Sequence, residues 1–343
     1  MALRRVALFG IGEWGRRWFD DLLELARRGL IELTVVDLYE EPPDVLKDPL
    51  KEGLVRYLPW DKALALPDLE IAIVVVPAKK HAEVIETILD FAQPKWVLCE
   101  KTAGDSLSDF CRILDACERK GSKFVMCDHY ILRKAVQHLL HESEKLAGLG
   151  EVSGIEAYMI EEKATGPDQE ANKDMLIHTL DVVHILFPRS EFIPSEAFIS
   201  QAKREPNADV TYTLSFGGLR FQGKGEGLCL HEVGKQLFNR KEIIIKAEAG
   251  TLKIDLTTNR VALFKEDGDE KEWYRSPNVW SYKNLILKVI NDSAVEELPI
   301  FGALPPLFVL RSWIELEEVR RMAKELPPYE RGRLPRIKEV MRV

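Results

Sequence analysis

The feature that most constrains this chain is a run of three glycines between an apolar strand and an amphipathic helix. Gly10, Gly12 and Gly15 fit the pattern G-x-G-x-x-G. The apolar run at residues 6–9 is typical of a strand buried on both faces, and residues 15–29 have helical spacing that ends at a glycine. Strand, glycine turn and helix in this order predict a dinucleotide site, although a plain tight turn also accounts for the glycines alone.

The alternation of strand and helix continues to residue 128. Further strand-like apolar runs lie at residues 31–37, 71–77, 96–101 and 123–129. Strand, helix and strand in succession predict a doubly wound parallel sheet with right-handed crossovers. We therefore expect an α/β, Rossmann-type dinucleotide-binding domain at residues 1–128.

Residues 129–343 have a different pattern. Glycine breaks and alternating apolar residues, typical of antiparallel strands, occur at residues 150–162, 210–230 and 241–267. Helices are predicted at residues 174–187 and 305–327. We expect an α+β substrate-binding domain with a large, open, mostly antiparallel sheet, whose C-terminal helix packs back on the first domain. Such an open sheet favours a homo-oligomer, a dimer or tetramer, formed by face packing.

The net charge of −8 argues against two classes of partner. Nucleic acids and anionic membranes are bound through a positive face, so neither is expected. No apolar run reaches the roughly 20 residues of a membrane span, and the N-terminal run is too short for a signal peptide.

The cysteines indicate a reducing compartment. None of the five lies in a C-x-x-C pair, so a zinc cluster is not expected; they are Cys99, Cys111, Cys117, Cys127 and Cys229. Their odd number, and the apolar surroundings of Cys99 and Cys127, favour free buried thiols. We therefore expect a cytoplasmic protein.

The acid at the end of the second predicted strand bears on the choice of dinucleotide. Asp37 stands 22 residues after Gly15. A carboxylate there accepts hydrogen bonds from a ribose 2′-hydroxyl and repels a 2′-phosphate. This favours NAD over NADP, whereas the alternative interpretation makes Asp37 a loop cap.

Lys101 ends another predicted strand. The carboxyl ends of parallel strands line the ligand crevice of a doubly wound sheet, so this lysine could bind a substrate hydroxyl beside the nicotinamide. It could equally be an ordinary loop lysine.

The predicted helix at residues 174–187 carries ionisable groups among apolar ones. Asp174, His178 and Asp181 lie at i, i+4 and i+7, on one face of a helix that is apolar nearly all round. A paired acid and imidazole on a buried helix form a plausible acid–base device. Alternatively, Asp174 serves the helix dipole and His178 is a core histidine; His184, on another side, is assigned to the core.

Residues 127–140 read "CDHYILRKAVQHLL", an apolar strand that ends in polar groups. Asp128, His129, Tyr130, Arg133 and Lys134 follow within seven residues. They are either the floor of an active site or a polar loop whose aspartate caps the next helix.

These motifs together resemble the Gfo/Idh/MocA oxidoreductases over nearly the whole chain. The likeness rests on the glycine pattern, on "VVVPAKKH" with Pro77 and His81, on "CEKTAG" and on "DMLIHTLD". It implies Lys101, Asp174 and His178 as catalytic residues. The cofactor residues that it implies are Gly10, Gly12, Glu13, Trp14, Gly15, Asp37, Pro77, His81, Glu100 and Lys101.

The chain departs from that family's pattern at two positions. Thr102 replaces a proline, so a cis-proline turn is not expected there. Leu176 replaces a glycine, which narrows the approach of the substrate or the nicotinamide. Neither change removes a catalytic group.

The segment "DHYILRKAVQHL" also resembles a motif of glucose-6-phosphate dehydrogenase. This likeness implies that Asp128 orients His178, and that His129 and Arg133 face a phosphate. It places Tyr130 in the substrate site as well. Leu132 and Lys134 replace that motif's glycine and glutamate, and the chain is too short for the usual form of that enzyme.

The expected activity is NAD(P)-dependent hydride transfer at a hydroxyl or keto carbon of a sugar, cyclitol or sugar phosphate. His178 would exchange the proton and Lys101 would bind the reacting oxygen, so no metal is expected. The alternatives are a non-catalytic dinucleotide-sensing regulator and a reductase of an imine or a tetrapyrrole.

Overall fold

The structure, a computed structural model, gives a fold for most of the 343 residues. The described residues are 3–66, 68–150, 152–161, 177–186, 190–192, 210–217, 219–221, 228–234, 240–265, 267–276 and 281–325. They form two compact units, one of residues 1–132 and 280–311, the other of residues 133–279 and 312–343. The first unit thus also takes in a segment near the C-terminus, which the sequence analysis assigned to the second domain.

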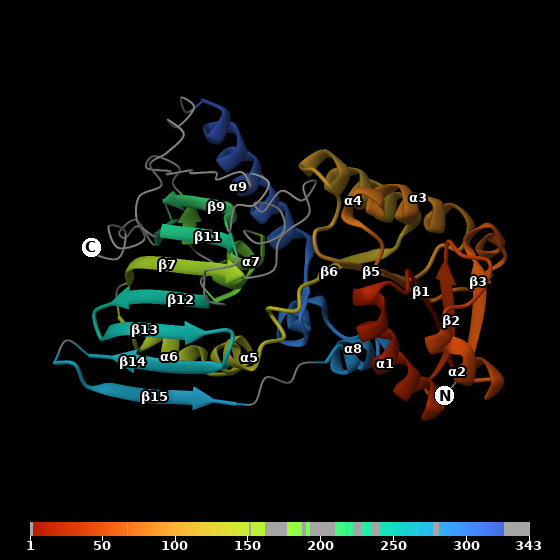
Figure 1. The fold of residues 1–343 in the computed structure, drawn as a ribbon, viewed down its shortest axis with the longest axis horizontal. Helices are drawn as coiled ribbons and strands as arrows, with labels where there is room; N and C mark the ends of the chain where they lie inside the picture. Colours follow the sequence, from red (N-terminus) through yellow and green to blue (C-terminus); the bar gives the residue numbers. More distant parts are fainter. Residues whose placement is uncertain are drawn as a thin grey trace. The chain divides into compact units, whose positions relative to one another are not determined.

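The first unit is built on a seven-stranded sheet, counting the described residues (Figure 1). Its strands are β1 (Arg4–Phe9), β2 (Ile31–Asp37), β3 (Val55–Pro59), β4 (Ile71–Val74), β5 (Trp96–Glu100), β6 (Lys123–Cys127) and β16 (Ala303–Leu304). Their order is β16-β6-β5-β4-β1-β2-β3, and β16 is antiparallel to β6 whereas the other pairs are parallel. This order confirms the predicted doubly wound fold.

Helices cover both faces of this sheet. The helices are α1 (Glu13–Arg27), α2 (Lys47–Lys51), α3 (His81–Phe91), α4 (Leu107–Lys120) and α8 (Lys283–Ile290), with 3₁₀ turns η1 (Asp44–Leu46), η2 (Trp60–Ala65), η3 (Ala78–Lys80) and η6 (Val295–Phe301). Helices α3 and α4 lie on one face, and α1 and α8 on the other (Figure 1). Since both faces are covered, strands β1 and β4 bury their side chains on both sides, as their apolar sequences predict.

The second unit contains another seven-stranded sheet within the described residues. Its strands are β7 (Val152–Glu161), β9 (Val210–Gly217), β11 (Leu228–Gly234), β12 (Arg240–Ala247), β13 (Gly250–Asp255), β14 (Arg260–Phe264) and β15 (Glu270–Arg275). Their order is β15-β14-β13-β12-β7-β11-β9, and β7 with β11 is its parallel pair. The prediction of a large, mostly antiparallel sheet is confirmed.

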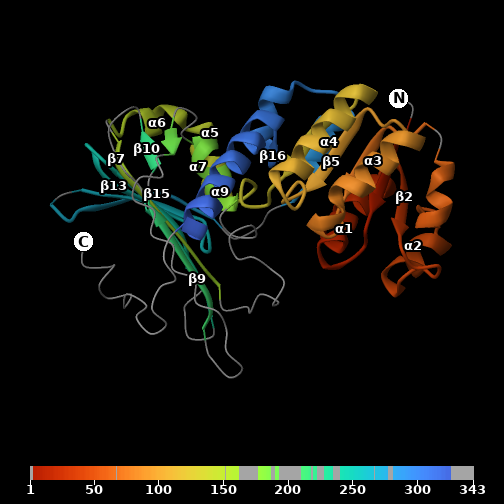
Figure 2. The same ribbon diagram turned by 90° about the horizontal axis from the view of Figure 1, so that it is seen from above.

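The remaining elements of this unit are short strands and helices. They are β8 (Ser190–Phe192), β10 (Leu219–Phe221), α5 (Lys134–His141), α6 (Ser143–Ala147), α7 (Ile177–Leu186) and the larger part of α9 (Pro306–Glu325). Helix α5 packs on β13, β15 and α7. Figure 2 shows α5, α6 and α7 on the same side of the sheet.

Two further findings concern the whole set of described residues. None of their helices combines the length and the apolar composition that crossing a bilayer requires. Cys99, Cys111, Cys117 and Cys127 are free; Cys99, Cys117 and Cys127 are buried, whereas Cys111 is exposed. The predicted free, buried state of Cys99 and Cys127 is confirmed.

Candidate active site

The glycine turn brings the start of α1 against the end of β1. The Gly10 N–H donates to the Val36 carbonyl at 2.8 Å. Gly10 has a φ of +98°, and a Cβ at this position would lie 2.6 Å from the Val75 carbonyl oxygen. A Cβ at Gly15 would lie 2.1 Å from the carbonyl oxygen of Gly10. Both positions therefore require glycine for packing of the turn itself.

Gly12 is different, because a Cβ there would meet nothing within 4 Å. It is the N-cap residue of α1, and as a glycine it has no side chain to cap the helix. The first backbone N–H groups of a helix lack partners within the helix and favour an anion. The open space at Gly12 thus fits a group such as a pyrophosphate, and the turn does more than reverse the chain.

Asp37 ties the end of β2 to the glycine turn. One carboxylate oxygen accepts from the Ile11 N–H at 2.7 Å, and the other accepts from the Leu38 N–H at 2.7 Å. Asp37 therefore does cap the loop, as the alternative interpretation states, and this role does not exclude a second one in binding. Each oxygen keeps a lone pair for a further donor, so the carboxylate can also accept from a ribose hydroxyl.

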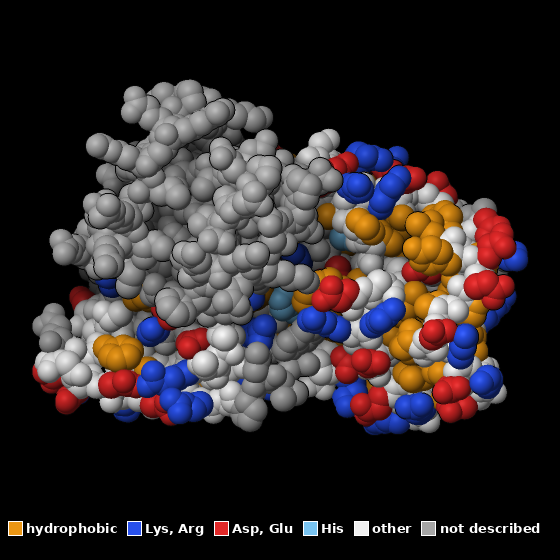
Figure 3. All heavy atoms as spheres, viewed as in Figure 1, with side chains coloured by type: hydrophobic (Ala, Val, Ile, Leu, Met, Phe, Trp, Pro, Cys, Tyr) orange, Lys and Arg blue, Asp and Glu red, His pale blue; other side chains and the backbone are white. Residues whose placement is uncertain are grey.

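A cavity of about 510 Å³ opens at the carboxyl ends of β1, β2 and β4, where doubly wound sheets bind ligands. Four of the predicted cofactor residues line it: Gly10, Gly12, Asp37 and Pro77. Its lining also includes residues that the motif did not indicate: Arg16, Tyr39, Trp60 and Lys80. Leu38 and Tyr39 in the lining are 81% and 71% exposed. Figure 3 shows hydrophobic side chains gathered between charged ones on one face of the first unit.

Trp14 packs toward the end of β6 and is not part of the cavity lining. Its ring centroid lies 4.7 Å from that of His129, and the Arg17 guanidinium lies 4.1 Å from the Trp14 ring. Glu13, also predicted as a cofactor residue, forms an exposed ion pair with Arg17. The glycine turn and the polar segment after β6 are therefore connected through one aromatic contact.

The polar segment after β6 is buried. Asp128 is fully buried, and His129 and Tyr130 are 6% and 1% exposed. An Asp128 carboxylate oxygen accepts from the Tyr130 N–H at 2.7 Å, so this aspartate closes its own turn. Helix α5 begins at Lys134 with Arg133 as its N-cap, so the interpretation of Asp128 as a helix cap is wrong.

Lys101 follows β5 at the same edge of the sheet. Its N–H donates to the Cys127 carbonyl at 3.1 Å, and the residue is half-buried. The peptide bond between Lys101 and Thr102 is cis, although no proline stands there. No cis-proline turn is expected here from the sequence, because Thr102 replaces the proline of the related motif. The peptide bond is nevertheless cis.

His81 is hydrogen-bonded to the turn that follows Lys101. Its Nδ1–H donates to the Thr102 carbonyl at 2.7 Å, and the ring is fully buried. Burial lowers the pKa of His81 to about 4, against the raising effect of backbone hydrogen bonds. His81 is therefore neutral near pH 7, and it is not part of the cavity lining.

Glu100, also predicted as a cofactor residue, is 5% exposed and lies among buried donors. The Trp18 Nε1–H donates to the Glu100 carboxylate at 2.8 Å. The Tyr282 hydroxyl donates to the same carboxylate at 2.5 Å. Burial raises the pKa of Glu100, and the hydrogen bonds from Tyr282 and Trp18 lower it in part. The motif gave no signal for Trp18 or Tyr282.

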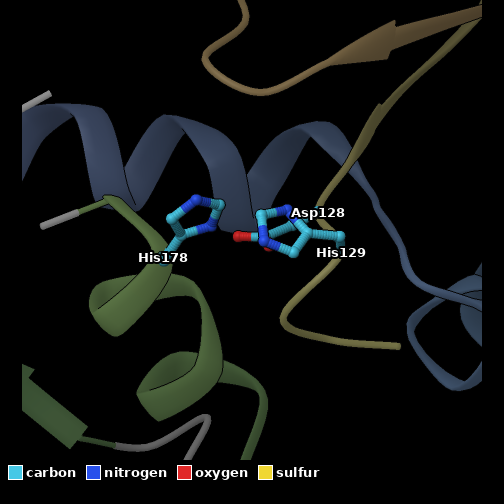
Figure 4. Close-up of side chains that lie close together, drawn as sticks. All are labelled: Asp128, His129 and His178. Atoms are coloured by element: carbon cyan, nitrogen blue, oxygen red, sulfur yellow. The ribbon is translucent and has the colours of Figure 1, made fainter. Parts of the chain in front are cut away.

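In the second unit, His178 lies near the start of α7. Figure 4 shows it on that helix, and Asp128 and His129 on the segment after β6. His178 is 2% exposed, and His184 is fully buried. Asp181 is also buried, and its carboxylate accepts from the Ser312 hydroxyl at 2.6 Å. The predicted burial of this helix is confirmed for its described side chains, whereas Asp174 and Leu176 lie outside the described residues.

Comparison with known proteins shows the fold of the chain. No family model and no curated protein matches its sequence. UDP-N-acetylglucosamine 3-dehydrogenase GnnA from Acidithiobacillus ferrooxidans is similar in structure, with a TM-score of 0.69 and 17% identity, over 94% of this chain and 98% of that one. Aldose-aldose oxidoreductase from Caulobacter crescentus has a TM-score of 0.72 and 18% identity, over 94% and 98%.

A third similar structure is a super-repressor mutant of Gal80p from Saccharomyces cerevisiae, with a TM-score of 0.72 and 17% identity, over 94% of this chain and 96% of that one. The fold of the chain is shared over nearly the whole length of these neighbours, so the predicted fold class is confirmed, whereas the resemblance to the Gfo/Idh/MocA family stays a prediction. The local likeness to glucose-6-phosphate dehydrogenase stays a prediction.

Proposed function

We propose that this protein is a nicotinamide dinucleotide-dependent oxidoreductase acting on a hydroxyl or keto carbon of a sugar, cyclitol or sugar phosphate. The observation that carries the proposal is the glycine turn, with open space at Gly12, the N-cap residue of α1. The adjoining cavity of about 510 Å³ suits part of a dinucleotide.

The residues around this cavity fit the cofactor's chemistry. The α1 N-terminus would hold the pyrophosphate, and Asp37 would accept from the ribose 2′-hydroxyl, which favours NAD. When bound, the nicotinamide supplies the hydride donor or acceptor. Arg16 and Lys80 in the cavity lining add positive charge that suits a phosphate.

The chain's own residues would manage the proton and the developing charge. Lys101 would hydrogen-bond the reacting oxygen and stabilise an alkoxide. His178 would take the hydroxyl proton in oxidation and return it in reduction. We infer that Asp174 and Asp128 orient the imidazole of His178; the family resemblance implies this for Asp174, and the local likeness to glucose-6-phosphate dehydrogenase implies it for Asp128.

Two of the similar structures support a sugar-like substrate, since they are a UDP-N-acetylglucosamine 3-dehydrogenase and an aldose-aldose oxidoreductase. We further infer that His129 and Arg133 bind a phosphate on the substrate. Arg133→Ala should then raise KM about 10- to 100-fold for a phosphorylated sugar but hardly for its neutral parent, because one charge-assisted contact is lost. The exposed neighbour Lys134 offers the control Lys134→Ala, and equal effects on both substrates would remove the phosphate from the proposal.

The decisive test of the proposed function is a screen of nicotinamide fluorescence against sugars, cyclitols and sugar phosphates with NAD and NADP. Turnover of at least one such compound, preferentially with NAD, is expected. Turnover confined to imines or tetrapyrroles would keep the oxidoreductase and replace the substrate class. Dinucleotide binding without turnover of any compound would overturn the proposal.

One observation favours a second candidate, a dinucleotide-sensing regulator. The structure of the Gal80p super-repressor mutant is as similar to this chain as the oxidoreductases are. Retention of both Lys101 and His178 favours the enzyme, because a sensor has no need of a proton-exchanging pair. Turnover in the screen separates the two.

We also infer a cytoplasmic homo-oligomer. Its free described thiols suit a reducing compartment. Packing between the open sheets of two copies would form the oligomer. A monomeric mass in light scattering at micromolar concentration would contradict it.

A further inference from the structure

A segment far along the chain returns to the first unit and is held on α1. The Asp21 carboxylate accepts from the Ser281 hydroxyl at 2.8 Å and from the Tyr282 N–H at 2.6 Å. Lys283 Nζ donates to the Glu24 carboxylate at 2.8 Å. These contacts fix the backbone of Tyr282 at the N-cap of α8 without using its side chain.

The side chain of Tyr282 is fully buried and makes further contacts of its own. Its ring stacks on Trp18, with centroids 3.8 Å apart and an interplanar angle of 10°. Its hydroxyl donates to Glu100 Oε1 at 2.5 Å, the same oxygen that accepts from Trp18 Nε1–H at 2.8 Å. The other oxygen, Oε2, accepts from the Lys101 N–H at 3.2 Å, and this N–H also donates to the Cys127 carbonyl at 3.1 Å.

One buried carboxylate therefore joins Tyr282 to Lys101. A buried carboxylate stays charged only when donors and opposite charges offset the loss of water. Burial raises the pKa of Glu100, and the hydrogen bond from Tyr282 is the largest effect that lowers it, ahead of Trp18 and the charge of Lys101. Burial likewise raises the pKa of Tyr282, so its hydroxyl stays a donor.

Other titratable groups also face this carboxylate. Those that interact with Glu100 are Lys101, Asp128, Cys99, Cys127 and Tyr282. The nearby negative charge of Asp128 raises the pKa of Glu100, so the donors oppose both burial and a like charge.

We propose that Tyr282 is a positioning residue for Lys101, acting through the Glu100 carboxylate. Fixed by Tyr282 and Trp18, this carboxylate holds the backbone of Lys101 through its N–H and presents a negative charge to its ammonium group. The role of Lys101 in turnover rests on the proposed function. The link between Tyr282 and the charge of Glu100 does not.

A purely structural role for Tyr282, docking α8 on α1, makes a different prediction. Tyr282→Phe keeps the ring and the backbone contacts of Tyr282 and removes only the hydroxyl. If the residue merely docks the helix, the variant loses some stability and the ionisation of Glu100 shifts with the lost hydrogen bond, but kcat stays that of the unmutated protein. If it positions Lys101, kcat falls as well.

The matched control is Tyr274→Phe, which loses a hydroxyl from a half-buried ring on β15 of the second unit. In the full-length protein, ¹³C NMR of labelled glutamate carboxyls reads the ionisation of Glu100, and a Glu100→Gln sample assigns its signal. Steady-state kinetics on any substrate found in the screen give kcat and the KM for the dinucleotide. A dinucleotide titration checks that each variant binds cofactor.

In Tyr282→Phe we expect the Glu100 titration to move to higher pH. We expect kcat to fall about 10- to 100-fold, the usual effect of losing a hydrogen bond to a charged group, with the dinucleotide KM within about two-fold. Tyr274→Phe should match the unmutated protein in all three. A Glu100 titration that does not move in Tyr282→Phe would overturn the inference, as would a kcat equal to that of Tyr274→Phe.

The two proposals fail separately. If the unmutated protein turns over no compound, the proposed function fails, and the movement of the Glu100 titration still decides whether Tyr282 controls that carboxylate. If the protein turns over a sugar and kcat of Tyr282→Phe stays that of the unmutated protein, the proposed function stands, and Tyr282 is a docking residue.

Discussion

At the scale of single residues, Asp37 combines two functions that a sequence motif does not separate. It holds the glycine turn through the Ile11 N–H, and it stands where a dinucleotide ribose is recognised. Asp37→Ala should narrow the NAD preference over NADP by roughly 5- to 150-fold, since a hydrogen bond and a repulsion worth about 1–3 kcal/mol are removed together. Fluorescence titration with both dinucleotides measures this.

The exposed acid Glu40 is not part of the cavity lining, so Glu40→Ala should leave both affinities unchanged. Asp37→Ala should also lower the melting temperature, because two backbone N–H groups lose their acceptor. Tighter binding of NADP than NAD by the unmutated protein would contradict the assigned role of Asp37.

His81 gives a prediction about the pH dependence of stability. Its pKa is about 4 in the folded protein, against an ordinary value of 6.5. Between these values the unfolded chain binds more protons than the native one, so the free energy of unfolding rises with pH, by about 3 kcal/mol from this group. His81→Gln should lose this contribution, so its free energy of unfolding should rise less between pH 4.5 and 7.

Urea unfolding at several pH values measures this difference. The control His141→Gln removes an exposed histidine and should keep the slope of the unmutated protein. Equal pH slopes for His81→Gln and the unmutated protein would show that His81 is not held neutral by burial.

At the scale of elements, two glycines of one turn have different roles: Gly15 is required for packing, and Gly12 is proposed to make room for the dinucleotide. In Gly15→Ala the new methyl group would collide with the Gly10 carbonyl, so this variant should lose several kcal/mol of stability, as overpacked sites do. In Gly12→Ala the methyl group meets open space, so the melting temperature should change little. Its dinucleotide affinity should fall at least about ten-fold, because the methyl group occupies space assigned to the pyrophosphate.

Differential scanning fluorimetry and a dinucleotide titration test this pair of glycine variants. Gly29→Ala is the matched control, since Gly29 also has open space around it but lies at the other end of α1. Its positive φ of +65° makes a small stability loss expected, and dinucleotide affinity should not change. Full dinucleotide affinity in Gly12→Ala would refute the assignment of this site.

The elements that the sequence predicted correctly are those with strong local signals. Strand β4 is apolar throughout, β5 and β6 each have one polar residue at an end, β1 ends in four apolar residues, and β2 has apolar residues at four of its seven positions; Gly29 and Gly121 follow α1 and α4 with a positive φ. Strand β3 is partly polar and ends in a proline, and β16 has two residues, so neither has a pattern that distinguishes it from a loop. Both form because a sheet edge offers unpaired backbone groups.

The site residues also divide into those with a local sequence signal and those without one. Gly10, Gly12 and Asp37 were predictable because the motif fixes their spacing along the chain. The bond from Tyr282 to Glu100 spans 182 positions, and no local pattern encodes it. Apolar spacing alone does not place the start of α5 at Lys134, because Ile131 and Leu132 continue that spacing although they lie in the preceding turn.

At the scale of the whole molecule, the residues proposed for catalysis come from both units. Lys101 belongs to the first unit and His178 to the second. Because both are proposed to act on one reacting oxygen, removing both should cost little more in kcat than removing one. Multiplied losses in the double variant Lys101→Ala/His178→Ala would show that the two residues act independently.

The measurement that tests the central proposal most directly is kcat of His178→Ala, taken together with its dinucleotide affinity. We expect kcat to fall by roughly 10²- to 10⁴-fold, the range for a positioned acid–base group, while dinucleotide affinity stays within about two-fold. His184→Ala, on the same buried helix, should lower stability, and its folded fraction should keep its turnover. A well-folded His178→Ala protein with near-normal kcat would contradict the proposed mechanism.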